Sequence, residues 1–270
     1  MTKLHFHYSM KLFYTEPVDP CYFTIKCLPK NTERQKLVNI NIDMDPRARY
    51  SQSSDGFGND KIIGAVRQPH DHYYLDVTGE VEIHQLLYEE LAVPEKIGMY
   101  KYSYGKTWSG EGLKGYANKL AEELKSQNLY KVYDKAINVM HIFYRDFKYD
   151  TTATDINTSA EEAFTMGRGV CQDYAHIYIC LLRLLGIPAR YVTGLMIGEG
   201  QSHAWVEFLN NDKWIGLDPT NDLLIDDNYI KLGHGRDASD CTINLGIMRG
   251  GGDQRQEIEV KVWKDTNIND

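Results

Sequence analysis

A cysteine that follows two closely spaced glycines is the residue best placed for chemistry in this sequence. Cys171 comes after Gly167 and Gly169, and glycine lets a backbone turn sharply. From Cys171 onward, apolar or small residues recur three and four positions apart, which predicts a helix that ends at Gly186 and Pro188. The thiol would lie in the first helical turn, where unpaired N–H groups favour a thiolate. Cys171 is therefore a candidate nucleophile, and the alternative is a buried helix cysteine.

A predicted β-hairpin downstream supplies the other groups that a cysteine nucleophile needs. Residues 203–208 and 213–218 alternate between apolar and polar side chains, and residues 210–211, both asparagine, favour a turn between them. With these two asparagines at the centre of the turn, the ladder places His203 directly opposite Asp218. One face of the hairpin is then apolar and the other carries the titratable groups, whereas a slip of one residue would exchange the faces.

A carboxylate beside an imidazole enables that imidazole to activate a thiol. The carboxylate of Asp218 can accept an N–H from His203, fix its tautomer and stabilise the imidazolium. The other ring nitrogen of His203 then remains for the thiol. Taken singly, His203 also fits an exposed strand histidine, and Asp218 fits a turn residue before Pro219. Their cross-strand match favours the paired arrangement.

Four segments in the second half of the chain resemble the bacterial transglutaminase-like superfamily, whose members are often described as cysteine proteases. They occur in the family's order, at residues 169–176, 186–192, 203–207 and 214–221. The resemblance implies a papain-like triad of Cys171, His203 and Asp218, in an α+β core where the cysteine helix packs on an antiparallel sheet. More weakly, residues 55–59 and 69–71 resemble the N-terminal domain that often precedes this core.

Acyl transfer through such a triad also needs donors for an oxyanion. The backbone N–H of Cys171 supplies one of them. Gln172 and Trp205 are candidates for the second donor or for a substrate contact, although Gln172 should point elsewhere on the helix. An aromatic hydroxyl or indole from upstream is a further alternative, and the sequence leaves this choice open.

The bulk composition is that of an ordinary globular protein. The chain has 270 residues, of which 42% are hydrophobic and 25% charged, and its net charge is −8. This acidic balance argues against a nucleic-acid partner, which would require a basic face. No apolar stretch approaches the roughly 18 residues of a spanning helix, and the N-terminus lacks the pattern of a signal peptide. We therefore expect no membrane partner, a cytoplasmic location and five reduced cysteines.

Neither a metal nor a cofactor is expected. His5 and His7 would share one strand face, and His70 and His72 lie two positions apart. No cysteine, carboxylate or third histidine stands at ligand spacing from either pair, so solvated strand and loop positions are favoured.

Two glycine-rich runs, at residues 233–237 and 249–252, also lack the context of a binding motif. A phosphate cradle would need a strand before the glycines and a helix after them, and neither run opens a helical pattern. Both runs are therefore predicted to be loops. The first contains His234, a second candidate base that has no predicted carboxylate partner and so ranks below His203.

Strand and turn signals divide the chain into three parts. Residues 1–92 contain short strands punctuated by proline and glycine, which is typical of an antiparallel β-sandwich. Residues 93–128 form a connecting segment, in which the aromatic stretch 100–110 is either inter-domain packing, which we favour, or a wall beside the substrate. Residues 129–270 form the transglutaminase-like catalytic domain.

Helical periodicity predicts the helices that precede the catalytic cysteine. Residues 116–124 and 129–147 have amphipathic patterns, and Ser159 and Glu162 are spaced as the capping box of a further helix. The second of these helices should bury one face, formed by Tyr133, Ile137, Met140, Phe143, Tyr144 and Phe147.

The sequence thus predicts a cysteine-dependent hydrolase that acts on a peptide, a protein or a small amide through a thioester. The first alternative is γ-glutamyl transfer to an amine, because nothing in the triad distinguishes water from an amine as the acceptor. The second is a non-catalytic binding module, since a fold alone implies no function. The natural substrate and the oligomeric state cannot be read from the sequence.

Overall fold

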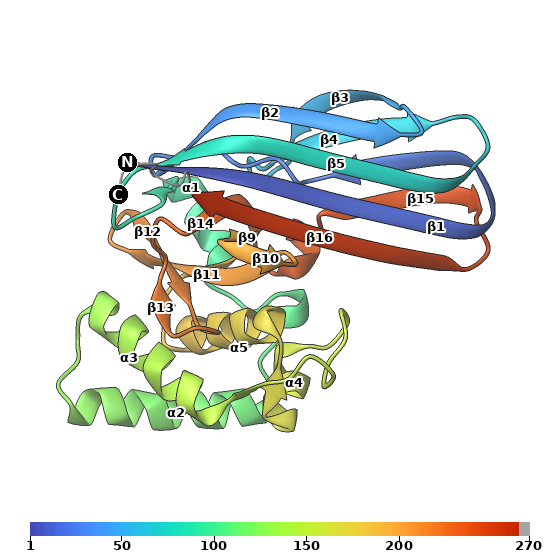
Figure 1. Cartoon of the computed structure of the whole chain (residues 1–270). Coiled ribbons are helices and arrows are strands. Elements are labelled where there is room, and N and C mark those ends of the chain that lie inside the picture. The colour runs from blue at the N-terminus through green and yellow to red at the C-terminus, as the bar shows by residue number, and fades with distance from the viewer. Residues whose placement is uncertain (265–270) are drawn as a thin grey trace.

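The computed structural model of this chain describes residues 1–264 and has three layers (Figure 1). A curled antiparallel sheet of eight strands forms one side, a six-stranded antiparallel sheet lies in the middle, and a group of helices covers the other side. The fold is therefore α+β, as predicted. Within the described residues, no helix is both long enough and apolar enough to cross a membrane.

The first sheet is a sandwich closed by one long, bent strand. Its strands are β1 (Thr2–Ile25), β2 (Gln35–Asp45), β3 (Arg49–Ser54), β4 (Asp60–Val66), β5 (His70–Ile83), β10 (Gly198–Gly200), β15 (Asn244–Gly250) and β16 (Gln254–Lys264). The first half of β1 pairs with β5 and β16, whereas its second half pairs with β4 and β15. The strand thus passes from one layer of the sandwich to the other, and its bend is visible in Figure 1.

Alternation along β1 builds the core of the sandwich. Every second side chain of its first half is buried, namely Leu4, Phe6, Tyr8, Met10 and Leu12. This period of two is what a strand requires when one of its faces is covered. Strands β15 and β16 from the far end of the chain belong to the same sheet, which the expected division at residues 92 and 128 did not include.

The middle sheet carries the predicted hairpin. Its strands are β6 (Glu90–Leu91), β9 (Ala189–Met196), β11 (His203–Asn210), β12 (Lys213–Asp218), β13 (Leu223–Leu224) and β14 (Tyr229–Gly235), in the spatial order β13, β12, β11, β9, β14, with β6 beside β12. One face packs on the helices through Ala204, Val206 and Phe208. Leu195 and Ile230 belong instead to the core of the first sheet, so the middle sheet is covered on both sides.

The hairpin forms, but its predicted register is wrong by two residues. Asn210 pairs with Lys213, so the turn is Asn211-Asp212, with Asn211 at a φ of 59°. Asparagine tolerates this left-handed conformation better than most residues. If this register is continued outward along the hairpin, Trp205, and not His203, lies directly opposite Asp218. A shift of two residues leaves every side chain on its predicted face, so His203 and Asp218 remain neighbours diagonally.

The helices are α1 (Pro94–Ile97), α2 (Glu111–Ser126), α3 (Val132–Asp146), α4 (Ala160–Met166) and α5 (Cys171–Leu184). The capping box of α4 is present as predicted, because Ser159 and Glu162 exchange hydrogen bonds at its start. The helix α5 lies between the other helices and the middle sheet and is almost wholly buried from Asp173 onward. Tyr144, which was expected in the buried face of α3, is exposed instead, because that face is centred on Val139 and Phe143.

The glycine-rich run at 233–237 is only partly a loop. Contrary to the prediction, residues 233–235 continue strand β14, where they pair with β9. Asn59 from the turn after β3 exchanges two hydrogen bonds with the backbone of His234, which pins this extra length of strand to the first sheet. The run at 249–252 is also only partly a loop, because Arg249 and Gly250 end strand β15 and only residues 251–252 lie outside it, although all three glycines have positive φ.

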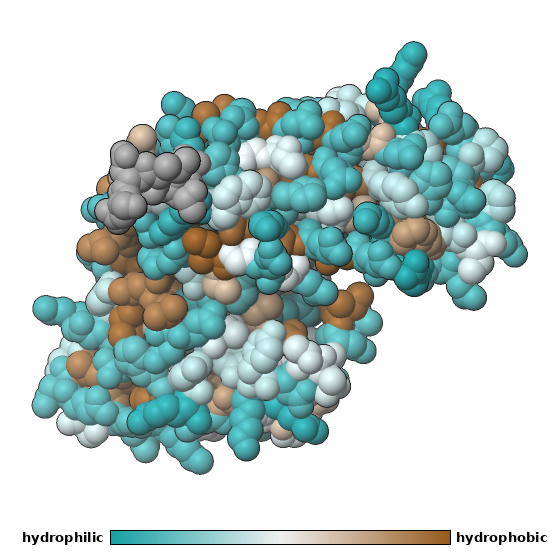
Figure 2. Space-filling model, viewed as in Figure 1, coloured by the Kyte–Doolittle hydropathy of each residue, from teal (hydrophilic) through white to brown (hydrophobic). Residues whose placement is uncertain are grey.

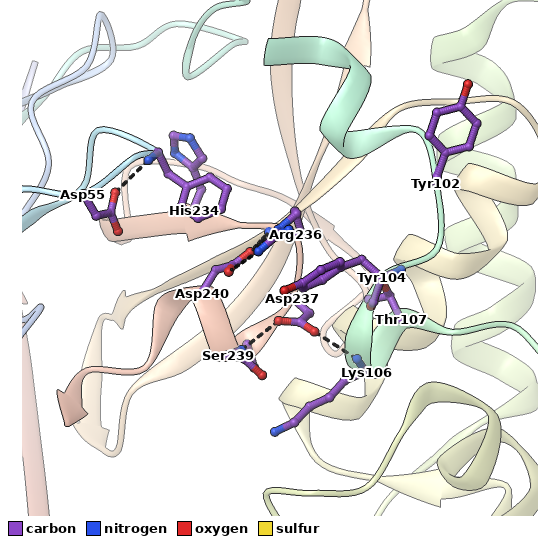
Figure 3. A network of polar contacts seen from close by, with 12 residues as sticks. Asp55, Tyr102, Tyr104, Lys106, Thr107, His234, Arg236, Asp237, Ser239 and Asp240 are labelled. Atoms are coloured by element: carbon purple, nitrogen blue, oxygen red, sulfur yellow. Dashed lines mark hydrogen bonds and ion pairs between the residues drawn. The ribbon is translucent and has the colours of Figure 1, made fainter. Parts of the chain in front are cut away.

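The connecting segment packs between the two sheets and the helices, as favoured from its composition. Buried Arg183 on α5 donates to the backbone oxygens of Tyr100 and Tyr102 and to the hydroxyl of Thr107. Figure 3 shows the adjoining network, in which Arg236 lies against the ring of Tyr104. Further along this network, Asp237 accepts the backbone N–H of Lys106, and Arg236 forms an ion pair with Asp240 (Figure 3). These contacts fix the segment to the core.

Candidate active site

Cys171 is the first residue of α5, and its side chain is half-buried. The turn that presents it is held by Asp173, whose carboxylate accepts the N–H of Val170 at 2.8 Å and the hydroxyl of Thr154 at 2.6 Å. Gly169 is required here, because a Cβ at that position would lie 2.5 Å from Oδ2 of Asp173. As the first helical residue, Cys171 has a backbone N–H with no acceptor inside the helix.

The other four cysteines have quite different surroundings. Cys21, Cys27, Cys180 and Cys241 are all buried. Burial raises the pKa of Cys27 and of Cys180 to about 12, so both thiols stay protonated at neutral pH. Of the five thiols, only Cys171 combines access to solvent with a helix N-terminus.

His203 stands between the thiol and a carboxylate. Its Nε2 lies 2.7 Å from Oδ2 of Asp218, so the predicted contact of the two residues is confirmed. Burial alone would lower the pKa of His203, but hydrogen bonds and charge from Asp218 and Cys171 outweigh it and raise that pKa to about 10. The imidazole is therefore a cation at neutral pH, with a negative partner on one side and the sulfur on the other.

Asp218 is held by a shell of donors that the sequence did not reveal. Besides His203, its Oδ2 accepts the hydroxyl of Tyr229 at 2.9 Å and the side-chain amide of Asn221 at 2.7 Å. Its Oδ1 accepts the backbone N–H groups of Thr220 and Asn221. Burial alone would raise the pKa of Asp218, but these bonds and the charge of His203 hold that pKa below its usual range. The carboxylate is thus ionised and fixed in orientation.

Comparison with known proteins finds two matching families. Residues 118–219 match the transglutaminase-like superfamily, and residues 4–82 match the bacterial transglutaminase-like N-terminal region. Both matches support the resemblance inferred from the sequence, and each covers less than half of the chain. The four sequence segments from which the resemblance was inferred lie within or next to the matched core.

Similar proteins come from several bacteria. An uncharacterised protein of Mycobacterium tuberculosis is 29% identical over 276 residues, which cover 87% of this chain and 84% of that protein. A protein-glutamine gamma-glutamyltransferase of Pseudomonas aeruginosa is 29% identical over 119 residues, but these cover only 38% of this chain and 18% of that protein. The crystal structure of a "Putative Cysteine Protease" from Cytophaga hutchinsonii superimposes with a TM-score of 0.80 at 23% identity, covering 99% of this chain and 92% of the other. This last likeness shows the fold.

The transglutaminase-like core also places the two remaining candidates from the sequence. Gln172 follows the cysteine and is half-buried, and its role stays a prediction. Trp205 is only 1% exposed and packs edge-on against Tyr229, with its ring centroid 6.4 Å from that of His203. Gly194 on the next strand makes room for this indole, because a Cβ there would collide with it. The buried indole of Trp205 thus packs next to the imidazole of His203 and supports it from inside the protein.

Tyr149 is a neighbour of the thiol that the sequence analysis missed. It lies on β7 (Lys148–Tyr149), which pairs in parallel with β8 (Arg168–Gly169), directly ahead of Cys171. Burial and then the nearby charge of Cys171 raise the pKa of Tyr149, whose side chain is 58% exposed. The parallel pairing of two short, distant segments leaves no local sequence pattern, so nothing in the sequence could have indicated this contact.

Apolar surface adjoins Cys171, His203 and Asp218. Leu223 pairs with Asp218 in the sheet, and both Leu223 and Leu224 are exposed. Figure 2 shows hydrophobic residues gathered over the region of β12 and β13, while hydrophilic residues dominate the rest of this face. Such a surface is suited to contact an apolar part of a substrate.

His234, the second candidate base, has no role beside the thiol. It is 4% exposed, and its Nε2 lies 3.2 Å from a guanidinium nitrogen of Arg190. Burial and the surrounding positive charges, Arg190 first, hold the pKa of His234 well below its usual range. It is therefore a neutral imidazole inside the protein and cannot take part in the chemistry of Cys171.

Proposed function

We propose that this protein is a cysteine-dependent hydrolase of peptides or amides, which works through a thioester on Cys171. The observation that carries the proposal is the alignment of three groups: a half-buried thiol at a helix start, an imidazole beside it, and an ionised carboxylate 2.7 Å from the far ring nitrogen. The match to the transglutaminase-like superfamily and the fold of the Cytophaga hutchinsonii protein support the same assignment.

In the first step, His203 and Cys171 form an imidazolium–thiolate pair, and the sulfur attacks the carbonyl carbon of the substrate. The new C–S bond pushes electrons onto the carbonyl oxygen, where the backbone N–H of Cys171 can stabilise the oxyanion. We assign the hydroxyl of Tyr149 as the second donor, since it lies near the thiol. When the C–N bond breaks, the imidazolium gives its proton to the departing amine or ammonia.

In the second step, the neutral imidazole of His203 takes a proton from water, and the resulting hydroxide attacks the thioester carbon. The C–S bond then breaks and the acid product leaves, while the sulfur of Cys171 departs as a thiolate beside the imidazolium of His203, which restores the starting pair. Asp218 does not change its protonation in either step. Its five hydrogen bonds hold the imidazole in one orientation and stabilise the cation whenever it forms.

A second candidate function is transfer of a γ-glutamyl group to an amine instead of to water. The specific observation in its favour is the 119-residue match to the protein-glutamine gamma-glutamyltransferase of Pseudomonas aeruginosa. Both reactions share the first step and differ only in the molecule that attacks the thioester. Hydrolysis is preferred because water needs no binding site of its own, and the exposed Leu223 and Leu224 beside Asp218 favour an apolar group over a charged amine.

The test is acylation by a p-nitrophenyl ester, followed by competition between water and a fluorescent primary amine. The wild type should release nitrophenol in a burst equal to the enzyme present and carry the acyl group on Cys171, as mass spectrometry of a tryptic peptide would show. Hydrolysis predicts that the amine leaves the deacylation rate unchanged, whereas transferase activity predicts an amine-dependent rate and a labelled product.

Two variants serve as controls. Cys171→Ala should show no burst, and a burst of wild-type size would refute the enzyme assignment. Cys21→Ala removes a buried thiol far from the site and should behave as the wild type. Tyr149→Phe should acylate more slowly by about tenfold if its hydroxyl stabilises the oxyanion, and at the wild-type rate if it does not.

A further inference from the structure

A cavity that is partly open to solvent lies away from the triad, where the first sheet, the connecting segment and the middle sheet meet. Its volume is about 200 Å³, and it is lined by Lys30, Phe57, Gly58, Glu90, Leu91, Val93, Lys96, Tyr100, Arg190, Trp214 and His234. Since one water molecule takes up about 30 Å³ in the liquid, the cavity could hold a few waters or one small ion with part of its hydration. The lining residues decide between these occupants.

Two buried polar groups in the lining have no hydrogen-bond partner. They are the hydroxyl of Tyr100, a residue only 1% exposed, and Nδ1 of His234. Because Arg190 can only donate, Nε2 of His234 must accept its hydrogen bond, so the proton of the neutral ring is on Nδ1. The nearest carboxylate oxygen, Oε1 of Glu90, is 3.6 Å from Nδ1, which is too far for a hydrogen bond. Both unpaired groups can therefore donate into the cavity.

The charges in the lining are not balanced. Arg190 is paired with Glu90 and Glu207, and buried Lys231 is paired with Glu207, so these two cations match these two anions. Lys30 is left with only a backbone oxygen as its partner, that of Gly58 at 2.6 Å.

Lys96 is the second uncompensated cation of the cavity. It likewise donates only to a backbone oxygen, that of Gly56 at 3.2 Å. Among residues 1–264, no carboxylate lies within ion-pair distance of either ammonium group. Partly buried charges without a counter-ion are costly, so the two lysines leave a deficit of two negative charges.

We propose that this cavity binds a small oxyanion of the phosphate class, held by Lys30, Lys96, Tyr100 and His234. A dianion would supply the two missing negative charges and accept the two unused hydrogen bonds. Waters could satisfy the donors but not the charge. Glu90 does not oppose the anion strongly, because Arg190 and Lys231 already compensate its carboxylate. The proposal does not depend on the chemistry at Cys171.

Binding would join three segments that are far apart in the sequence, so its first readout is thermal stability. The melting temperature of the full chain should rise with inorganic phosphate in a saturable way, by roughly 5 °C at a concentration one hundred times the Kd. Sodium chloride at the same ionic strength and pH should not reproduce the rise. Sulfate should act like phosphate, and a response to acetate alone would replace the proposed class by a carboxylate.

Tyr100→Phe should affect stability and phosphate binding in opposite directions. Without phosphate the variant should be as stable as the wild type or more stable, because it removes a buried hydroxyl that has no partner. With phosphate it should bind about five- to tenfold more weakly by isothermal titration calorimetry, since one hydrogen bond to the anion is lost. Tyr102→Phe, at an exposed tyrosine two residues away, is the matched control and should bind as the wild type.

Lys96→Gln provides an independent variant, because its half-exposed side chain is not needed for packing. It should weaken phosphate binding by about tenfold, whereas Lys101→Gln, which makes the same charge change at a nearby exposed position, should leave binding unchanged. Equal responses to phosphate and chloride would overturn the proposal. So would phosphate binding that Tyr100→Phe and Lys96→Gln leave intact, because the anion would then lie elsewhere.

Discussion

His203 and His234 lie on either side of the same strand, β9, where they pair with Gly194 and Val192. Both are largely buried, and both were candidate bases from the sequence. Their pKa values nevertheless move in opposite directions, to about 10 for His203 and well below the usual range for His234.

The neighbours of the two histidines explain this difference. His203 faces the carboxylate of Asp218 and the sulfur of Cys171, whereas Arg190, Lys231, Lys30 and Lys96 surround His234 with positive charge. Burial by itself lowers the pKa of both rings, so the sign of the nearby charge decides the outcome. A buried histidine therefore indicates acid–base chemistry only when its partners favour the cation.

The largest effect expected from this comparison is on turnover. His203→Gln should reduce acylation of Cys171 by about 10³-fold or more, because the imidazole that activates the thiol is lost. His234→Gln should leave the rate per folded molecule unchanged, although the protein should be less stable. Burst kinetics on both variants check this, and a large loss of rate in His234→Gln would contradict the division of roles.

The second effect concerns stability. Glu207→Gln should lower the free energy of unfolding by about 3–5 kcal/mol, because Glu90 alone would then face two buried cations, Arg190 and Lys231. Acylation by the remaining folded protein should be unaffected. Glu199→Gln, which breaks an exposed ion pair with Lys261, should change the same free energy by less than about 1 kcal/mol. Urea unfolding measures both, and equal values would show that the buried charges matter no more than surface ones.

The third effect is a pH dependence carried by Asp218. Folding raises the pKa of His203 from 6.5 to about 10. The ion pair of His203 and Asp218 therefore stabilises the folded state fully below about pH 6.5, and this contribution is lost as the pH rises through about 10. Asp218→Asn should lower the pKa of His203 and remove the alkaline loss, and should slow acylation by about 10²-fold. NMR titration of the imidazole follows the pKa. Asp222→Asn, at a carboxylate paired with His141, is the control that should leave His203 unchanged.

The smallest effect is expected from Tyr229→Phe. It removes one hydrogen bond to Asp218 and should slow acylation by roughly five- to tenfold, equivalent to about 1 kcal/mol. Tyr178→Phe loses a comparable buried hydrogen bond, to the backbone of Ala136, but lies away from the triad. Both variants should be destabilised to a similar degree, and only the first should be slower. If both are equally slow, Tyr229 acts through stability alone.

Local patterns in the sequence predicted the parts of this site that depend on periodicity. The start of α5 at Cys171, the capping box at Ser159 and the two faces of the hairpin all follow from spacing within one or two elements. The register was wrong because Asn210, Asn211 and Asp212 are all good turn residues, and the choice among them depends on the conformation at Asn211. Because the register error is two residues, an even number, each side chain of the hairpin still lies on its predicted face.

What the sequence could not predict are contacts between distant segments. Tyr229 reaches Asp218 from another strand, Tyr149 approaches Cys171 from a two-residue strand, and Asn59 joins His234 across the two sheets. None of these contacts has a periodic signature, since each depends on which strands become neighbours in the fold. For the same reason the sequence did not reveal the cavity, whose lining comes from six separate stretches of the chain.

The pairing of β1 with β16 has a consequence for how the molecule is assembled. Leu4 and Lys264 are partners in one ladder, so β1 must wait for β16, which is synthesised much later, before the two strands can pair. Until then its apolar side would be open to other proteins or to chaperones. Such a long-range closure should make folding slow, and the first sheet should be completed only after β16 has been synthesised.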